Sequence, residues 1–209
     1  MNRTFTLSLA AAVVLLASAA SAHAALSVDT GTPNGNAVGA FAFDSNDFYA
    51  GQITFTDVTT IQEISTHVLN GATGETFTIA LYDDSAAHLP GTALYSATAT
   101  VDANGLNGWS GVSGLTGWNV QAGSYWVGLE IGSIDTVGMA SPTGALLDRG
   151  VAMPLAQTSF NSGSAYQATA GLDFGLRVSS VPAVPEPSET LLMLAGLVAL
   201  ASVVRKRLK

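Results

Sequence analysis

The chain has 209 residues, no cysteine and a formal net charge of −8. Without cysteine it can form no disulfide, no thiolate metal site and no cysteine nucleophile. Residues 25–181 hold only two basic residues, Arg149 and Arg177, against thirteen acidic ones, a net charge of −11, and a surface of that sign argues against nucleic-acid partners.

The first 24 residues have the organisation of a secretory signal peptide. Arg3 precedes an apolar stretch over residues 7–20, and Ala22 and Ala24 supply the small residues of a cleavage site. We expect signal peptidase to cut after Ala24 and to release a mature chain. An N-terminal membrane anchor or a buried helix is the alternative reading of this pattern.

The middle region, residues 25–181, is long enough for one domain with its own core. Its apolar residues alternate, as in residues 76–82, where Phe77, Ile79 and Leu81 share one face of a predicted strand. The same kind of pattern predicts further strands at residues 38–43, 52–56, 61–69, 94–101, 124–131 and 173–178, and a weaker one at 136–140.

Turn-forming dipeptides separate these eight or so strands, and no long helical periodicity lies between them. We therefore expect an all-β domain, a β-sandwich of the jelly-roll kind, flanked by an N-terminal signal helix and a C-terminal transmembrane helix. The glycines of residues 105–117 predict a long surface loop. The turn dipeptides are Asn70-Gly71, Pro90-Gly91, Asn104-Gly105 and Asn107-Gly108.

Residues 182–209 form a second membrane-directed element. The apolar run Leu191–Val204 is shorter than the roughly 20 residues that cross a bilayer comfortably, and it is followed at once by basic residues. Because such residues stay on the cytoplasmic side, the middle region should lie outside and the chain end inside. The basic residues are Arg205, Lys206, Arg207 and Lys209.

The order of features in this tail resembles the PEP-CTERM sorting domain of Gram-negative bacteria. Pro185, Glu186 and Pro187 match its motif, and the apolar helix 191–204 and the basic end 205–209 follow. The resemblance implies recognition and removal of the tail by exosortase, a membrane protease-transpeptidase. It also implies an inner-membrane intermediate, a final place at the cell surface or in the matrix, and an association with exopolysaccharide and biofilm. Glu189 departs from the usual uncharged spacer.

A second resemblance lies within the middle region. The residues Leu81-Tyr82-Asp83-Asp84, followed by Leu89-Pro90-Gly91 and Leu94, resemble a strand–loop–strand pattern of exported β-sandwich domains that share this anchor. It implies a β-sandwich and no particular activity.

Asp83 and Asp84 are the candidate calcium ligands. Calcium needs several oxygen atoms that converge on one point, whereas adjacent residues of a strand point to opposite faces. Solvated turn acids are therefore the first interpretation, and a calcium site is the alternative. Asp102-Ala103-Asn104-Gly105 starts like an EF-hand loop but lacks the later ligands, which favours an ordinary turn. No other cofactor is expected.

The signals for catalysis are weak. We expect His67 to point outward from its strand and His88 to lie in the proline loop, with no spacing that forms a zinc site. Residues 111–114 only approach the Gly-x-Ser-x-Gly motif of serine hydrolases. Thirteen acidic residues make chance pairs common, so they do not indicate a glycosidase.

Trp109, Trp118 and Trp126 are the candidate platforms for a sugar ring, because an exposed indole offers a flat apolar face. Packing in the core or at a sheet edge is the alternative role. The sequence thus predicts a non-enzymatic exported surface protein, a structural or adhesive part of an extracellular polysaccharide matrix. A carbohydrate-binding module and, at lower weight, an extracellular hydrolase are the other hypotheses.

Overall fold

A computed structural model describes residues 24–33, 39–44, 47–71, 74–101, 107–131, 145–151, 155, 157–161 and 165–182. Every regular element within these ranges is a β-strand, which confirms the predicted all-β class. The strands are β1 (Ala25–Asp29), β2 (Phe41–Ala42), β3 (Phe48–Phe55), β4 (Thr59–Leu69), β5 (Thr76–Asp84), β6 (Pro90–Thr100), β7 (Asn107–Ser113), β8 (Asn119–Val120), β9 (Gly123–Glu130), β10 (Leu146–Leu147), β11 (Thr158–Asn161), β12 (Gln167–Ala168) and β13 (Leu176–Pro182).

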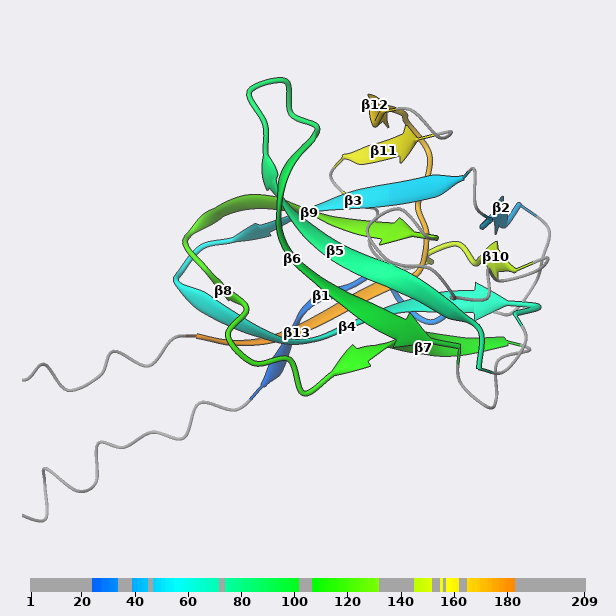
Figure 1. Ribbon diagram of the computed structural model, residues 1–209, viewed down its shortest axis with the longest axis horizontal. Coiled ribbons are helices and arrows are strands. Elements are labelled where there is room, and N and C mark those ends of the chain that lie inside the picture. The colour runs from blue at the N-terminus through cyan, green and yellow to red at the C-terminus, as the bar shows by residue number, and fades with distance from the viewer. Residues whose placement is uncertain are drawn as a thin grey trace, which may run out of the picture.

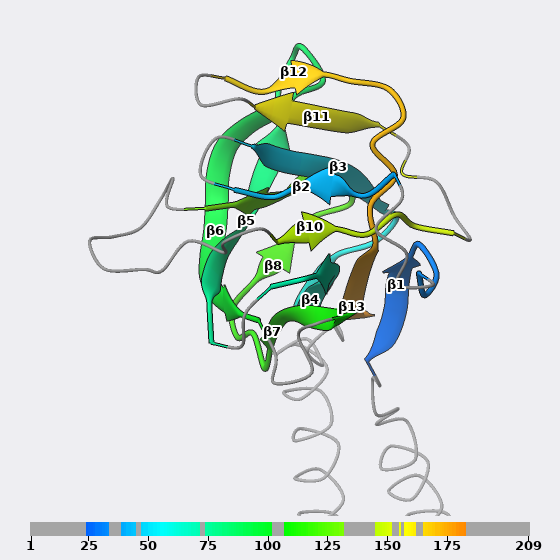
Figure 2. The same ribbon diagram turned by 90° about the vertical axis from the view of Figure 1, so that its right-hand side faces the viewer.

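The described strands join into one antiparallel sheet that curls around a single core (Figures 1 and 2). Its order is β1-β13-β4-β7-β6-β5-β9-β3-β11-β12, while β10 pairs with β2 and β4, and β8 pairs with β4. The strands therefore follow one hydrogen-bonded path, and they are not divided into two separate sheets.

The core forms where the sequence alternation predicts it. Phe77, Ile79 and Leu81 of β5 are fully buried, and so are Ile61 and Ile64 of β4. All five belong to one apolar cluster. Burying a side chain of this size contributes about 1.5–3 kcal/mol relative to leaving it exposed, so this cluster is the main stabilising element.

Several predicted strands lie where the sequence places them, with bounds that differ by a few residues. Strands β3, β4, β5, β6 and β9 cover predicted runs, and β13 starts later than predicted, at Leu176. The run at 38–43 shrinks to the two residues of β2, and the one at 136–140 lies outside the described residues. Strands β1, β7, β8, β10, β11 and β12 were not predicted, because most are short or rich in glycine and serine.

The predicted surface loop at residues 105–117 is wrong for its central part, and so is the turn at Asn107-Gly108. Residues 107–113 form β7, which pairs with β4 from Leu69 to Glu63. Gly111 fits this contact because a Cβ there would lie 2.2 Å from the carbonyl oxygen of Ile64. The glycine thus serves close strand packing, and the turn follows at Gly114, where φ is +69°.

The first and last described strands are neighbours. In β1 and β13, Ala25 lies opposite Ser180 and Asp29 opposite Arg177. Arg177 Nε lies 3.1 Å from Asp29 Oδ1, which adds an ion pair to the backbone ladder. The two ends of the described body therefore lie side by side, at one end of the molecule (Figures 1 and 2).

The predicted signal helix and the sorting tail, with Pro185, Glu186, Pro187 and the basic end, lie outside the described residues. In the part of the chain that the structure does describe, no helix has the length and apolar character to cross a membrane.

Candidate functional site

Trp126 lies on the face of β9 opposite to Val127 and Leu129, as predicted, but its side chain is fully buried. It cannot serve as an exposed sugar platform, and that prediction is wrong. On that face the indole is flanked by Gln52 of β3 and Tyr82 of β5, which lie directly opposite it. The indole Nε1 donates to Asp84 Oδ1 at 2.8 Å, so the residue anchors the outer face of the sheet.

A buried carboxylate lies further along the same face. Glu130 is 2 % exposed, and its Oε1 accepts hydrogen bonds from Tyr82 Oη at 2.6 Å and Tyr166 Oη at 2.5 Å. Gly128 makes room for both rings, since a Cβ there would lie 2.9 Å from Tyr82 Cε2. Burial and the nearby Glu130 raise the pKa of both phenols, so they stay protonated donors.

The cluster of Glu130, Tyr82 and Tyr166 was not predicted from the sequence. Glu130 falls on the polar side of an alternating strand, where a solvated acid is the ordinary expectation. Tyr166 comes from a segment far along the chain, next to β12. One signal was available: Glu130 stands in a long apolar run, between Leu129 and Ile131.

The carboxylates of Asp83 and Asp84 diverge, as the sequence predicted. Asp83 Oδ1 accepts from the backbone N–H of Thr92, whereas Asp84 bonds Trp126 and lies 2.9 Å from His88 Nδ1. Burial alone would raise the pKa of Asp84, but these hydrogen bonds outweigh it and hold the pKa below its ordinary value. Within the described residues no three His, Cys, Asp or Glu side chains converge, so a calcium site here stays a prediction.

Asp84 and Glu130 share a face but are too far apart for glycosidase chemistry. Glu130 lies opposite Thr78, which is six residues from Asp84 along β5. At about 3.4 Å per residue the two positions are about 20 Å apart. Glycosidase carboxylates are about 5–9.5 Å apart, so this pair cannot flank one scissile bond.

Trp109 contacts one charged and one polar side chain, the Arg177 guanidinium and the His67 ring. The guanidinium carbon of Arg177 is 3.9 Å from the centre of its ring, and the His67 ring meets it edge-on at 5.3 Å. One face of this indole is thus covered by Arg177. Its Nε1 is buried and has no hydrogen-bond partner.

His67 lies on the face of β4 opposite to the core residue Val68, as predicted, but it is buried there, with 5 % exposure. The reason is that β4 pairs with β13 and β7 on its two edges, while Gly175 and Asp148 pack against the histidine. Its Nδ1 lies 3.4 Å from Asp148 Oδ2, without hydrogen-bond geometry. Burial lowers the pKa of His67, and Arg177 lowers it further, against the opposing effect of Asp148.

The third candidate platform, Trp118, is 7 % exposed and stacks on Tyr95, with ring centres 5.2 Å apart. Tyr95 Oη donates to the carbonyl oxygen of Asn119 at 3.0 Å. Trp118 and Trp126 are therefore buried, and Trp109 has one ring face covered by Arg177, so none is the fully exposed platform that sugar stacking needs.

Both arginines of the described body are engaged by aromatic rings. Arg177 covers Trp109, and Arg149 lies 5.5 Å from the centre of the Phe41 ring. The surface therefore has little to offer an anionic ligand, in keeping with its negative charge.

The residues that approach a serine-hydrolase motif do not meet a histidine. Ser113 lies opposite Glu63 in the β4–β7 pair, whereas His67 lies opposite Trp109, four positions further along. That separation is about 14 Å at 3.4 Å per residue, too far for a serine–histidine hydrogen bond.

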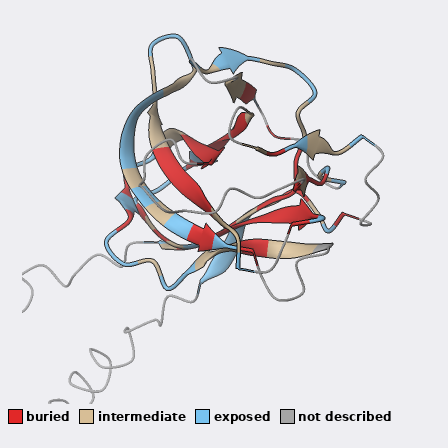
Figure 3. Cartoon of the chain, turned by 45° about the vertical axis from the view of Figure 1, so that its right-hand side comes forward, coloured by how far each residue is buried: buried red, intermediate tan, exposed pale blue. Residues whose placement is uncertain are grey.

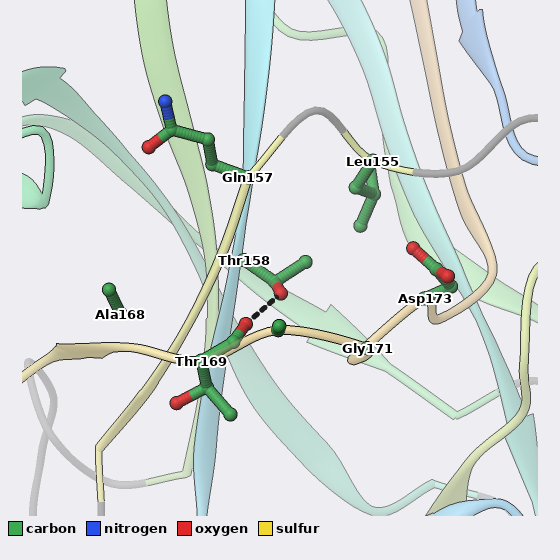
Figure 4. A pocket seen from close by; sticks show the side chains of 8 residues that line it. Leu155, Gln157, Thr158, Ala168, Thr169, Gly171 and Asp173 are labelled. Atoms are coloured by element: carbon green, nitrogen blue, oxygen red, sulfur yellow. Dashed lines mark hydrogen bonds between the residues drawn. The ribbon is translucent and has the colours of Figure 1, made fainter.

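An open depression lies between β11 and the segment that leads to β13 (Figure 4). Its volume is about 560 Å³, and its lining includes Leu155, Gln157, Thr169 and Asp173. Thr158 Oγ1 is occupied by a hydrogen bond to the carbonyl oxygen of Thr169. The carboxylate and amide can hold hydroxyl groups, but the lining offers no nucleophile paired with a base, so its chemistry is that of binding.

Comparison with known proteins adds no assignment. No protein-family model matches the chain, and no curated protein matches its sequence.

Proposed function

We propose that the chain is an exported, non-enzymatic surface protein that is sorted through its C-terminal tail by an exosortase-type enzyme. Its β-body would be a structural or adhesive part of an extracellular polysaccharide matrix of a Gram-negative bacterium. In this proposal the two halves of the curled sheet act as the layers of a jelly-roll sandwich. The chain passes through an inner-membrane intermediate before it reaches the surface.

The observation that supports this proposal is the position of the first and last described strands. Strand β1 starts at Ala25, directly after the expected signal cleavage, and β13 ends at Pro182, three residues before the Pro185-Glu186-Pro187 motif. Both expected processing sites lie outside β1 and β13, so cutting them removes no described strand. Because Ala25 lies opposite Ser180, the two strand ends next to these sites are neighbours. A body held by one end through a tail is what surface sorting requires.

The test is deletion of residues 185–209 in a host that has the sorting system. We expect the truncated chain to be exported and to appear in the medium, while the full chain stays with the surface or matrix fraction. The matched control replaces the basic residues Arg205, Lys206, Arg207 and Lys209 by Gln, which keeps the length and the Pro-Glu-Pro motif. The control should be exported but retained poorly, because the basic stop is lost. Equal fractionation of the full and truncated chains would contradict the proposal.

Carbohydrate binding is the second candidate function. Its candidate site is the depression at Leu155 and Asp173, which replaces the tryptophans as the proposed sugar-binding surface. Neutral sugar hydroxyls suit the Asp173 carboxylate and the Gln157 amide, whereas an anionic sugar would be repelled. Glycan-array binding that disappears in Asp173→Ala and persists in Trp109→Ala would support it. Binding that persists in Asp173→Ala and disappears in Trp109→Ala would instead indicate Trp109 as the sugar-binding residue.

A further inference from the structure

Strand β6 has an edge that its neighbours leave largely unpaired. It pairs with β5 along its whole length, but with β7 at one position only, Thr100 opposite Gly111. Beyond that point the side chain of Tyr95 reaches across to the carbonyl oxygen of Asn119 in β8. Two strands joined by backbone hydrogen bonds lie about 4.7–4.9 Å apart, so a gap that a tyrosine spans is wider than a paired ladder.

The exposure of β6 agrees with this. Residues 91–94, 96 and 98 are exposed, while Tyr95 and Ala97 turn partly inward. In Figure 3 this strand is mostly pale blue and tan, in contrast to the red strands of the core. Every second residue of an antiparallel strand directs its N–H and C=O away from its partner, so β6 presents a row of backbone donors and acceptors.

Soluble proteins usually protect such an edge with charged residues, above all lysine, or with proline. Between Gly91 and Thr100 there is no charged residue and no proline, and residues 25–181 contain no lysine. The residues present are mainly Thr, Ala, Leu, Tyr and Ser. Apart from Pro90 at its first position, the strand itself has no residue of the kind that opposes pairing with another strand.

Charge also restricts what could pair there. Between Asp84 and Glu130, which spans β6, β7 and β8, the sequence has one charged residue, Asp102. The rest of the body carries the other twelve acidic residues. Asp83 of β5 lies against the first residues of β6, but from Tyr95 to Thr100 the strand faces the uncharged residues 76–81 of β5. Two copies of a body with a charge of −11 repel each other on most faces, and this uncharged part of β6 is where they can approach.

We propose that β6 pairs edge to edge with β6 of a second copy, which joins the two curled sheets through an antiparallel contact. A two-fold symmetric contact of this kind uses the same patch on both molecules and forms by strand addition. It does not depend on the proposed sorting, and it would make the body a cross-linking unit.

The absence of cysteine makes the proposal directly testable in the full chain. Single variants Leu94→Cys, Ser96→Cys and Thr98→Cys place a thiol on the outward side of β6, where facing Cβ atoms of paired strands are about 4.5–5.5 Å apart. Val58→Cys, at a position 42 % exposed outside the strands, is the control for random collision. After mild oxidation, non-reducing electrophoresis measures the disulfide-linked dimer.

We expect at least one β6 variant to give about tenfold more dimer than Val58→Cys, with a yield that rises with salt as the repulsion is screened. Adding Ser96→Glu to the Leu94→Cys chain should reduce the yield to the control level, whereas Ser96→Thr should leave it unchanged. Equal yields at β6 and at residue 58, or no response to Ser96→Glu, would overturn the proposal.

Discussion

Strands β9 and β6 both pair with β5, yet they differ in burial. The last five residues of β9 are all buried, whereas β6 alternates between exposed and partly buried positions. The difference lies in their neighbours: β9 is paired on both edges and carries Tyr82 and Tyr166 over its outer face, while β6 is paired along one edge. The burial of a strand therefore depends on its pairing partners and on the side chains that pack over its outer face.

The largest expected effect separates these two strands. Trp126→Ala removes a fully buried indole and its bond to Asp84, and should lower the free energy of unfolding by about 3–5 kcal/mol. The matched change on β6, Leu94→Ala, at a side chain 41 % exposed, should cost under about 1 kcal/mol. Urea unfolding of both variants checks this, and similar midpoints would mean that β9 is not covered.

A smaller effect is expected at the Glu130 cluster, which covers β9. Tyr82→Phe and Tyr166→Phe each remove a hydrogen bond to a carboxylate, so each should lower the free energy of unfolding by about 1.5–3 kcal/mol. The double variant should lose more than the sum, because each phenol partly compensates for the loss of the other at the shared oxygen. Tyr125→Phe, whose exposed hydroxyl bonds the Gln121 carbonyl, is the control and should lose under about 1 kcal/mol. Equal losses of unfolding free energy in Tyr82→Phe, Tyr166→Phe and Tyr125→Phe would contradict a stabilising role for the bonds to Glu130.

The smallest effect concerns pH, and it tests the burial of His67 in β4. Because its pKa is lowered in the folded state, the unfolded chain binds more protons below the ordinary value of about 6.5. Stability should then be complete above that pH and fall as the pH drops below it. The carboxylates contribute their own loss at lower pH, below about 4. His67→Gln should remove the step near 6.5 and keep the acid step, and an unchanged profile would refute the assignment.

The same contrast explains which features could be read from the sequence. The runs of β4, β5 and β9 were visible because apolar alternation marks the face toward the core, as with Phe77, Ile79 and Leu81. The divergence of Asp83 and Asp84 followed from the two-residue period of a strand. These are local properties of the chain.

The errors arose where distant segments meet. Trp126 and His67 occupy positions that alternation assigns to solvent, but neighbouring strands and Asp148 cover them. Residues 107–113 look like a loop because glycine is poor in strands, yet Gly111 is needed where β7 passes close to β4. The local sequence around these residues does not predict such contacts between distant segments.

The claim that the chain is exported and then released from its tail is tested most directly by the intact mass of the form recovered from the cell surface. We predict a mass that corresponds to a chain beginning at Ala25 and lacking the basic end, including Lys209. A surface form that still contains Met1, or one that retains Lys209, would contradict the claim.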